Sequence, residues 1–188
     1  ILSCGNFHGM PVAHAMDFAG IVISSLASIS HERISKFIST QMSELPAFLA
    51  PNSGLNSGHM IIQVASASLV SENKVLSHPA SVDSMPTSAE KEDHVSMGTI
   101  AARKFSSIVK NAYNVVAMEF LSNTQGLSMI APLKPAAGVK AAFDHIRKDV
   151  PYADVDRIFS KDVTKIHKMM TDGSLVAAVE KAIGPIHV

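Results

Sequence analysis

The chain has 188 residues, of which 47% are apolar and 5% aromatic, and its 16 basic residues balance 16 acidic ones. This balance argues against nucleic acid and anionic membranes as partners, because neither would meet a net positive field. Cys4 is the single cysteine, which excludes an intramolecular disulfide and leads us to expect a cytoplasmic location. Polar residues interrupt every apolar run before the roughly 18 residues that a membrane span needs. We therefore expect no membrane span and no signal peptide.

The start of the chain has the character of an internal loop. The stretch ILSCGNFHGMP lacks an initiator Met, and Gly5, Gly9 and Pro11 lie close together in it. Glycine and proline are typical of turns and loops. We expect the chain to be a piece of a longer protein, although a trimmed N-terminus explains the pattern equally well.

Apolar residues at helical spacing predict a first helix from Pro11 to about Thr40. Proline fits the first turn of a helix, where its missing N–H costs nothing. The two prolines and two glycines of SELPAFLAPNSGLNSG end this helix. A second helix is predicted over about residues 58–76, with Ser57 as its N-cap, before the turn-rich stretch HPASVDSMPTSAE.

A third helix is predicted from about Lys91 to Gln125, with Gly126 as its C-cap. Three shorter helical patterns follow Pro132, over about residues 135–148, 154–170 and 174–183. Nothing alternates with period two for long enough to indicate a sheet, so we predict an all-α fold.

The first and third predicted helices are unusually long, at about 30 residues against a mean of about 11–12. Each would span about 45 Å, whereas a compact domain of this size has a diameter of only about 40 Å. The stretches IVISSLASI and MIIQVASASLV also carry few charges. We infer a helix bundle shared between subunits, with small Ser and Ala residues allowing close approach. A single long bundle within one chain is the alternative.

The nine histidines do not predict a metal site. The closest pairs, His8 with His14 and His78 with His94, have no recognisable ligand spacing, and one cysteine cannot build a zinc cluster. The stretch NSGLNSG lacks the Lys and the preceding strand of a phosphate-binding loop. No Gly-x-Ser-x-Gly nucleophile motif occurs either.

Two segments have no obvious packing role. They are GNFHG at 5–9 and SAEKEDHVSMG at 88–98, where Glu90, Glu92 and Asp93 cluster at the predicted start of the third helix. Acids in a first helical turn stabilise it by about 0.3–1 kcal/mol each. From the residues alone this charge–dipole interpretation is favoured over catalysis, which stays open.

Four stretches of the sequence resemble histidine ammonia-lyases. They are GNFHGMPVAHAMD, LPAFLAPNSGLNSGHMI, ASLVSENKVLSHPASVDSMPTSAEKEDHVSMG and the long predicted helix that follows. The similarity runs in order over about the first 130 residues and is most specific over 71–98, whereas little is similar after Pro132. Phenylalanine and tyrosine lyases share GNF but typically carry Gln where this chain has Glu92.

The resemblance implies an all-α, L-aspartase/fumarase-like fold. Long central helices form a bundle shared within a homotetramer, and shorter C-terminal helices follow. We expect residues 1–130 to form the central-helix part and residues 131–188 the C-terminal helical part. The resemblance also implies the conversion of L-histidine to urocanate and ammonia, a step of histidine degradation.

The same resemblance implies an electrophile, 4-methylidene-imidazol-5-one (MIO), made from an internal Ala-Ser-Gly. That tripeptide does not occur in these 188 residues. The family's catalytic Tyr and its substrate-carboxylate Arg lie upstream of GNF and are absent as well. The chain is therefore expected to be the C-terminal portion of the enzyme, to need its N-terminal portion as a partner, and to be inactive alone.

Carried over residue by residue, Phe7 matches the active-site Phe of the GNF motif and Glu92 matches the acid that faces the substrate's imidazole. Asn6 is expected to set the loop, and Ser88, one helical turn before Glu92, to line the pocket. An ionised carboxylate only accepts hydrogen bonds, which suits the imidazole N–H. Phe7 would form an apolar wall against the ring.

The sequence departs from the family pattern at His59, where Phe is usual, and at Glu90 and Lys91, where Asn-Gln is usual. His59 puts the local packing in doubt. The other histidines, including His8 and His94, are interpreted as structural or surface groups. Two alternatives remain: a phenylalanine or tyrosine lyase or aminomutase, which Glu92 disfavours, and a catalytically dead helical scaffold with the lyase fold.

Overall fold

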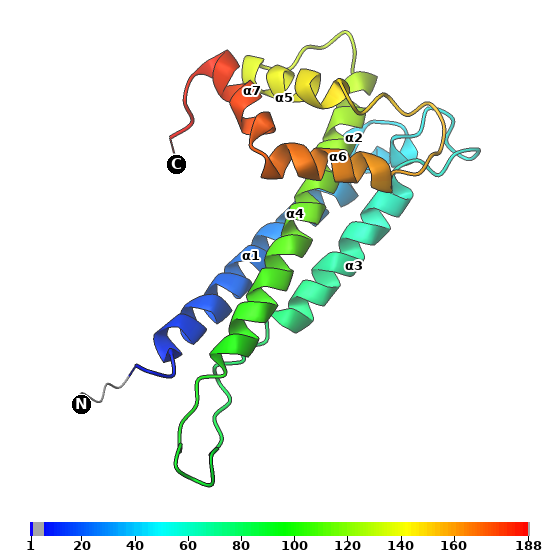
Figure 1. Cartoon of the computed structure of the whole chain (residues 1–188). Coiled ribbons are helices and arrows are strands. Elements are labelled where there is room, and N and C mark those ends of the chain that lie inside the picture. Colours follow the sequence, from blue (N-terminus) through cyan, green and yellow to red (C-terminus); the bar gives the residue numbers. More distant parts are fainter. Residues whose placement is uncertain (2–5, 188) are drawn as a thin grey trace. The chain divides into compact units, whose positions relative to one another are not determined.

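A computed structural model describes residue 1 and residues 6–187, so the expectations for Cys4 and Gly5 fall outside the described residues. The helices are α1 (Met10–Phe37), α2 (Thr40–Ser43), α3 (Met60–Leu76), α4 (Gly98–Met129), α5 (Ala137–Arg147), α6 (Ser160–Thr171) and α7 (Ser174–Ile183), with a 3-10 turn η1 at Ala47–Leu49 (Figure 1). In the described part, strand-like pairing is limited to two isolated bridges, Ser53 with Asn56 and Thr87 with Glu92. The predicted all-α class is confirmed.

Two predicted boundaries of the third helix are wrong. The helix α4 starts at Gly98 rather than Lys91, and Met97, just before it, has a φ of 51°, which a right-handed helix does not allow. It also continues through Gly126, the predicted C-cap. A Cβ at position 126 would clash with the ring of Phe37, so this glycine permits close packing inside α4 rather than ending it.

The chain divides into two compact units that do not follow chain order. Unit 1 contains Ile1–Ile29 and Ser68–Ala112, and unit 2 contains Ser30–Ala67 and Tyr113–Val188. Each of the long helices α1, α3 and α4 therefore contributes residues to both units. The expected division into residues 1–130 and 131–188 stays a prediction.

Unit 1 brings the start of α1, the end of α3 and the start of α4 side by side (Figure 1). Small residues allow this approach: a Cβ on Gly20 would lie 3.1 Å from Cδ1 of Ile108. The hydroxyls of Ser24 and Ser77 lie 2.6 Å apart, which links α1 to the end of α3. Small Ala residues form a core with methionines packed around it; the residues are Ala13, Ala80, Ala101, Met10, Met16 and Met97.

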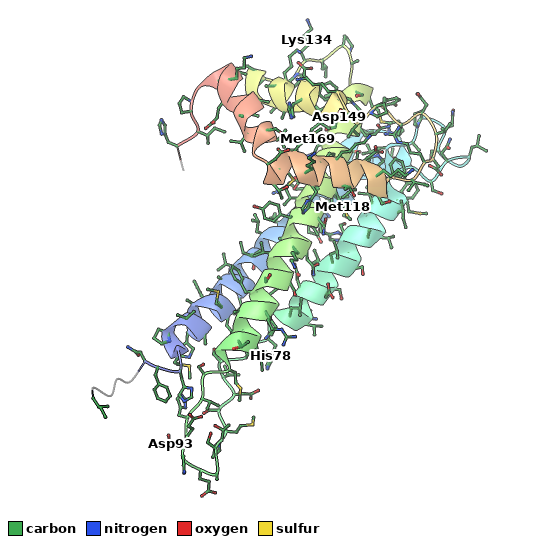
Figure 2. The ribbon with its side chains drawn as sticks, in the orientation of Figure 1. His78, Asp93, Met118, Lys134, Asp149 and Met169 are labelled. Atoms are coloured by element: carbon green, nitrogen blue, oxygen red, sulfur yellow. The ribbon has the colours of Figure 1, made fainter. Side chains whose placement is uncertain are left out.

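Unit 2 holds the larger apolar core. It combines the second half of α4 with α5, α6 and α7, and α7 packs against both α5 and α6. Figure 2 labels Met118 on α4 and Met169 on α6, both of which belong to this core. The carboxylate of Asp156 accepts hydrogen bonds from the backbone N–H groups of Ser57 (2.8 Å) and Gly58 (2.7 Å). Asp156 thus holds the backbone just before α3. The carbonyl of Ser57, the predicted N-cap, in turn accepts the N–H of Met60, the first residue of α3.

The departure at His59 is accommodated inside unit 2. The ring is 1% exposed, its Nδ1 lies 3.1 Å from Oγ of Ser122, and its edge faces the ring of Phe159 at 5.0 Å. Among the described residues, Nε2 of His59 has no hydrogen-bond partner. Burial, together with the positive charges of Arg157 and Arg147, lowers the pKa of His59 from 6.5 to about 4. The side chain is therefore a neutral core histidine at pH 7.

The helix α1 is long and apolar enough to cross a membrane by length and composition alone. The expectation that polar residues interrupt every such stretch is therefore wrong for α1. The apolar core helix of a soluble protein passes the same test.

Candidate functional site

The loop between α3 and α4 carries Glu92, the central residue of the predicted site. Figure 1 shows it as a long extended connection that leaves the ends of both helices, and Figure 2 labels Asp93 far along it. The loop folds back on itself where Thr87 and Glu92 pair: the N–H of Thr87 donates to the carbonyl of Glu92 at 2.9 Å, and the N–H of Glu92 donates back at 3.3 Å. This pairing fixes the backbone position of Glu92.

The turn inside this pairing is strained. Ser88, Ala89 and Glu90 have φ angles of 55°, 54° and 67°, a left-handed conformation that costs a non-glycine residue about 1–2 kcal/mol. Such strain concentrates at functional sites, where the surroundings hold it in place. Because this segment is not helical, Ser88 does not lie one helical turn before Glu92. Its place in a substrate pocket stays a prediction.

The charge–dipole interpretation of the acidic cluster is wrong. The first turn of α4, all of whose residues the structure describes, contains no acidic residue. Glu90, Glu92 and Asp93 instead lie on the loop, several residues before Gly98. Stabilisation of a helix start therefore does not account for them.

The base of the loop is anchored to two helices of unit 1. Oδ2 of Asp17, on α1, accepts a hydrogen bond of 2.8 Å from the backbone N–H of Ser81. The ammonium group of Lys104, on α4, donates to the carbonyl of His78. Burial raises the pKa of Asp17, but the hydrogen bonds from Ser81 and the charge of Lys104 outweigh it and lower the pKa overall. Asp17 is thus an ionised anchor at neutral pH.

Serine hydroxyls hold the rest of the loop. Oγ of Ser84 accepts the N–H of Val95 at 3.2 Å and lies 3.0 Å from Nδ1 of His94. The buried hydroxyl of Ser96 donates to the carbonyl of His8 at 2.6 Å. The last bond ties the loop directly to the GNFHG segment.

Residues 6–9 form a tight turn just before α1. The carbonyl of Asn6, the residue predicted to set this loop, accepts the N–H of Gly9 at 2.9 Å. Gly9 has a φ of 69°, which favours glycine at this position. The ring of Phe7 is 71% exposed and lies 4.1 Å, centroid to centroid, from the ring of His8. An apolar ring is thus presented outside the core of this chain.

The two predicted site residues come together through His8. Nε2 of His8 lies 3.9 Å from Oε2 of Glu92, while its ring contacts Phe7. Phe7, His8 and the start of α4 line an open hollow of about 780 Å³. An apolar ring and an imidazole thus line this hollow, and the carboxylate of Glu92, which is not part of the lining, lies next to the imidazole. These are groups that can hold a small aromatic or heteroaromatic molecule.

Sequence reasoning missed two residues of this arrangement. His8 was interpreted as structural, although its place beside Phe7 in GNFHG was a signal that it could reach the same surface. Oγ1 of Thr87 donates a 2.9 Å hydrogen bond to Oε2 of Glu92. Thr87 carried no signal, because its contact depends on the fold-back of the loop.

Among the described residues, no group of three His, Cys, Asp or Glu side chains is placed to hold a metal ion.

Comparison with known proteins identifies relatives over almost the whole chain. The sequence model of the family described as aromatic amino acid lyase matches residues 1–148. Histidine ammonia-lyase of Sorangium cellulosum (strain So ce56) is 50% identical over 188 residues, which is 100% of this chain and 37% of that relative. Histidine ammonia-lyase of Alkaliphilus oremlandii (strain OhILAs) is 49% identical over 97% of this chain and 36% of that relative.

Solved structures agree with these sequence relatives. Histidine ammonia-lyase from Trypanosoma cruzi superposes with a TM-score of 0.93 at 40% identity, covering 97% of this chain and 36% of that chain. Tyrosine aminomutase from Streptomyces globisporus superposes with a TM-score of 0.92 at 30% identity, covering 97% and 35%.

The similarity therefore extends beyond residue 130, so the expectation of little similarity after Pro132 is wrong. The chain spans just over a third of the length of the curated relatives it matches.

Proposed function

Because this chain belongs to the aromatic amino acid lyase family, we propose that it supplies part of the active site of an enzyme that converts L-histidine to urocanate and ammonia. The observation that carries the proposal is the convergence of Phe7, His8 and Glu92 on one surface of unit 1. The identity of about 50% to histidine ammonia-lyases supports histidine rather than phenylalanine or tyrosine as the substrate.

Glu92 and Phe7 divide substrate recognition between them. An imidazole ring carries N–H donors that a phenyl or phenol ring lacks, and an ionised carboxylate accepts without donating. A hydrogen bond to such a charged group contributes about 1.5–3 kcal/mol. The exposed ring of Phe7 supplies an apolar face against which the substrate ring can pack.

The electrophile of the family, the MIO group, does not fit the residues of this chain by themselves. It is made from an Ala-Ser-Gly tripeptide, and none occurs in the 188 residues. When bound, such a group supplies the electrophilic chemistry of ammonia release. We propose that a companion segment carries it, while this chain binds and orients the imidazole.

The exposed face of α1 supports a shared assembly. Large apolar residues on the part of this helix in unit 1 lie open to solvent: Val12, Phe18, Ile21, Val22, Leu26 and Ile29. A row of exposed apolar side chains of this extent marks an interaction surface. We propose that companion helices cover it in a homotetramer, and that the assembled enzyme is cytoplasmic.

The test is an assay of the protein that contains this chain. We expect ammonia release and urocanate formation from L-histidine, with much lower turnover of L-phenylalanine and L-tyrosine. A preference for either of those two substrates would support the lyase or aminomutase alternative. A folded, assembled protein with no activity on any of the three would support the scaffold alternative.

A further inference from the structure

We propose that Thr87 is a positioning residue that holds one oxygen of the Glu92 carboxylate and thereby leaves the other for the imidazole of the substrate. The inference rests on the proposed function. It starts from three contacts between the same two residues: two backbone hydrogen bonds and one from the hydroxyl of Thr87 to Oε2 of Glu92.

The side-chain bond restrains a group that would otherwise move freely. A glutamate side chain on a loop has large rotamer freedom, and fixing it costs conformational entropy. Threonine is a suitable anchor, because its branched Cβ restricts χ1 and its backbone is already paired with that of Glu92. The Oγ1–Oε2 distance of 2.9 Å lies within the ordinary range for an O–H···O bond.

Both neighbours of the carboxylate lie on the same oxygen. Thr87 donates to Oε2, and Nε2 of His8 lies 3.9 Å from Oε2. Among the described residues, none donates a hydrogen bond to Oε1 of Glu92. A carboxylate has about four acceptor sites on its two oxygens. Oε1 is therefore the oxygen available to accept the imidazole N–H.

A purely structural role for Thr87 makes a different prediction. If the residue only closed the loop, its backbone pairing would suffice, and its hydroxyl would affect activity no more than other loop hydroxyls do. Thr87→Val keeps the backbone pairing and the branched shape while removing the donor. Thr87→Ser keeps the donor while removing the methyl group. The two variants therefore separate orientation of Glu92 from closure of the loop.

The experiment measures kcat/KM for L-histidine in the assembled protein that contains this chain. Thr87→Val should lower kcat/KM by about three- to tenfold, which corresponds to the loss of one hydrogen bond. Thr87→Ser, which keeps the donor, should retain most of the parent kcat/KM. In a Glu92→Gln background the same Thr87→Val change should have a clearly smaller effect, because residues that act through each other are not additive. Ser84→Ala, which removes another hydroxyl of the same loop that does not touch Glu92, should change kcat/KM by the same factor in the parent and in the Glu92→Gln background.

Equal losses of kcat/KM from Thr87→Val in both backgrounds would overturn the positioning role. A Thr87→Ser variant that loses as much kcat/KM as Thr87→Val would overturn it too. A large effect of Glu92→Gln with none from Thr87→Val would overturn it as well, while leaving the proposed function intact. A parent protein that does not release ammonia from histidine would instead refute the proposed function itself. Circular dichroism and sedimentation of each variant confirm that fold and assembly are unchanged.

Discussion

Nε2 of His8 lies 3.9 Å from Oε2 of Glu92, and this contact joins two segments that are far apart in the sequence. The distance is too long for a hydrogen bond, so the contact indicates proximity rather than a fixed bond. It brings the turn at residues 6–9 next to the loop before α4. Phe7 contacts His8 as well, so Phe7 and Glu92 both lie beside the same imidazole.

The first prediction concerns Glu92 in the assembled protein that contains this chain. Glu92→Gln keeps the size of the side chain but replaces the ionised acceptor with a neutral amide. A loss of about 1.5–3 kcal/mol corresponds to roughly a 10- to 150-fold fall in kcat/KM for histidine. Turnover of phenylalanine, whose ring has no N–H, should fall much less. The measured quantity is the ratio of kcat/KM for the two substrates.

Glu90→Gln is the matched control for this prediction. Glu90 is an exposed acid on the strained turn of the same loop, and no described residue forms an ion pair with it. Its loss should leave the substrate ratio unchanged. An unchanged ratio in Glu92→Gln, with fold and assembly intact, would mean that Glu92 does not face the substrate ring.

The second prediction is that the 188-residue chain alone has no lyase activity. It contains no Ala-Ser-Gly from which the family's electrophile could form. Urocanate formation, followed by absorbance, is the measurement, on a sample whose intact mass corresponds to this chain only. Turnover by that sample would show that the chemistry does not depend on a companion segment.

The third prediction concerns the exposed apolar face of α1. Ile21→Glu combined with Leu26→Glu places two charges on a face that we propose is covered in the assembly. Each change removes an apolar contribution of about 1.5–3 kcal/mol and adds a charge that is costly to bury, so the complex should dissociate at much higher protein concentration. Sedimentation over a range of concentrations measures the shift. Leu133→Glu, on the exposed connection after α4, is the control and should assemble normally.

Sequence patterns predicted the long helices well, because an apolar stripe repeated over many turns leaves little choice of structure. The start of α4 was placed too early for a physical reason: acids at Glu90, Glu92 and Asp93 look like the first turn of a helix. The left-handed turn at Ser88, Ala89 and Glu90 contains no glycine, so nothing in the sequence indicates it. This turn brings Thr87 onto Glu92, which explains why Thr87 escaped notice.

At the other end of α4 the predicted boundary is also too early, because a glycine was expected to end the helix. Gly126 resembles a C-cap, yet it lies inside α4 because the ring of Phe37 occupies the space where a Cβ would be. Close approach between two helices is a tertiary effect that one residue's identity does not encode. Phe7 and Glu92, by contrast, are predicted as site residues from motif resemblance, which relates positions far apart in the sequence as periodicity does not, and their role in a site stays a prediction.

The last prediction is that His59 makes the stability of the protein depend on pH. Its pKa is lowered to about 4 in the folded chain, against 6.5 when solvent-exposed, so the unfolded chain binds more protons between these values. The contribution of His59 to the free energy of unfolding is therefore fully present above pH 6.5. It is lost as the pH falls towards 4, by about 3 kcal/mol in total.

His59→Phe removes the titrating ring and the buried nitrogen without a partner, and should remove this loss. Free energies of unfolding in urea between pH 4 and 7 provide the measurement, with His187→Gln, an exposed histidine, as a control that keeps the full loss. The same pH dependence in His59→Phe as in the parent would show that other groups cause it.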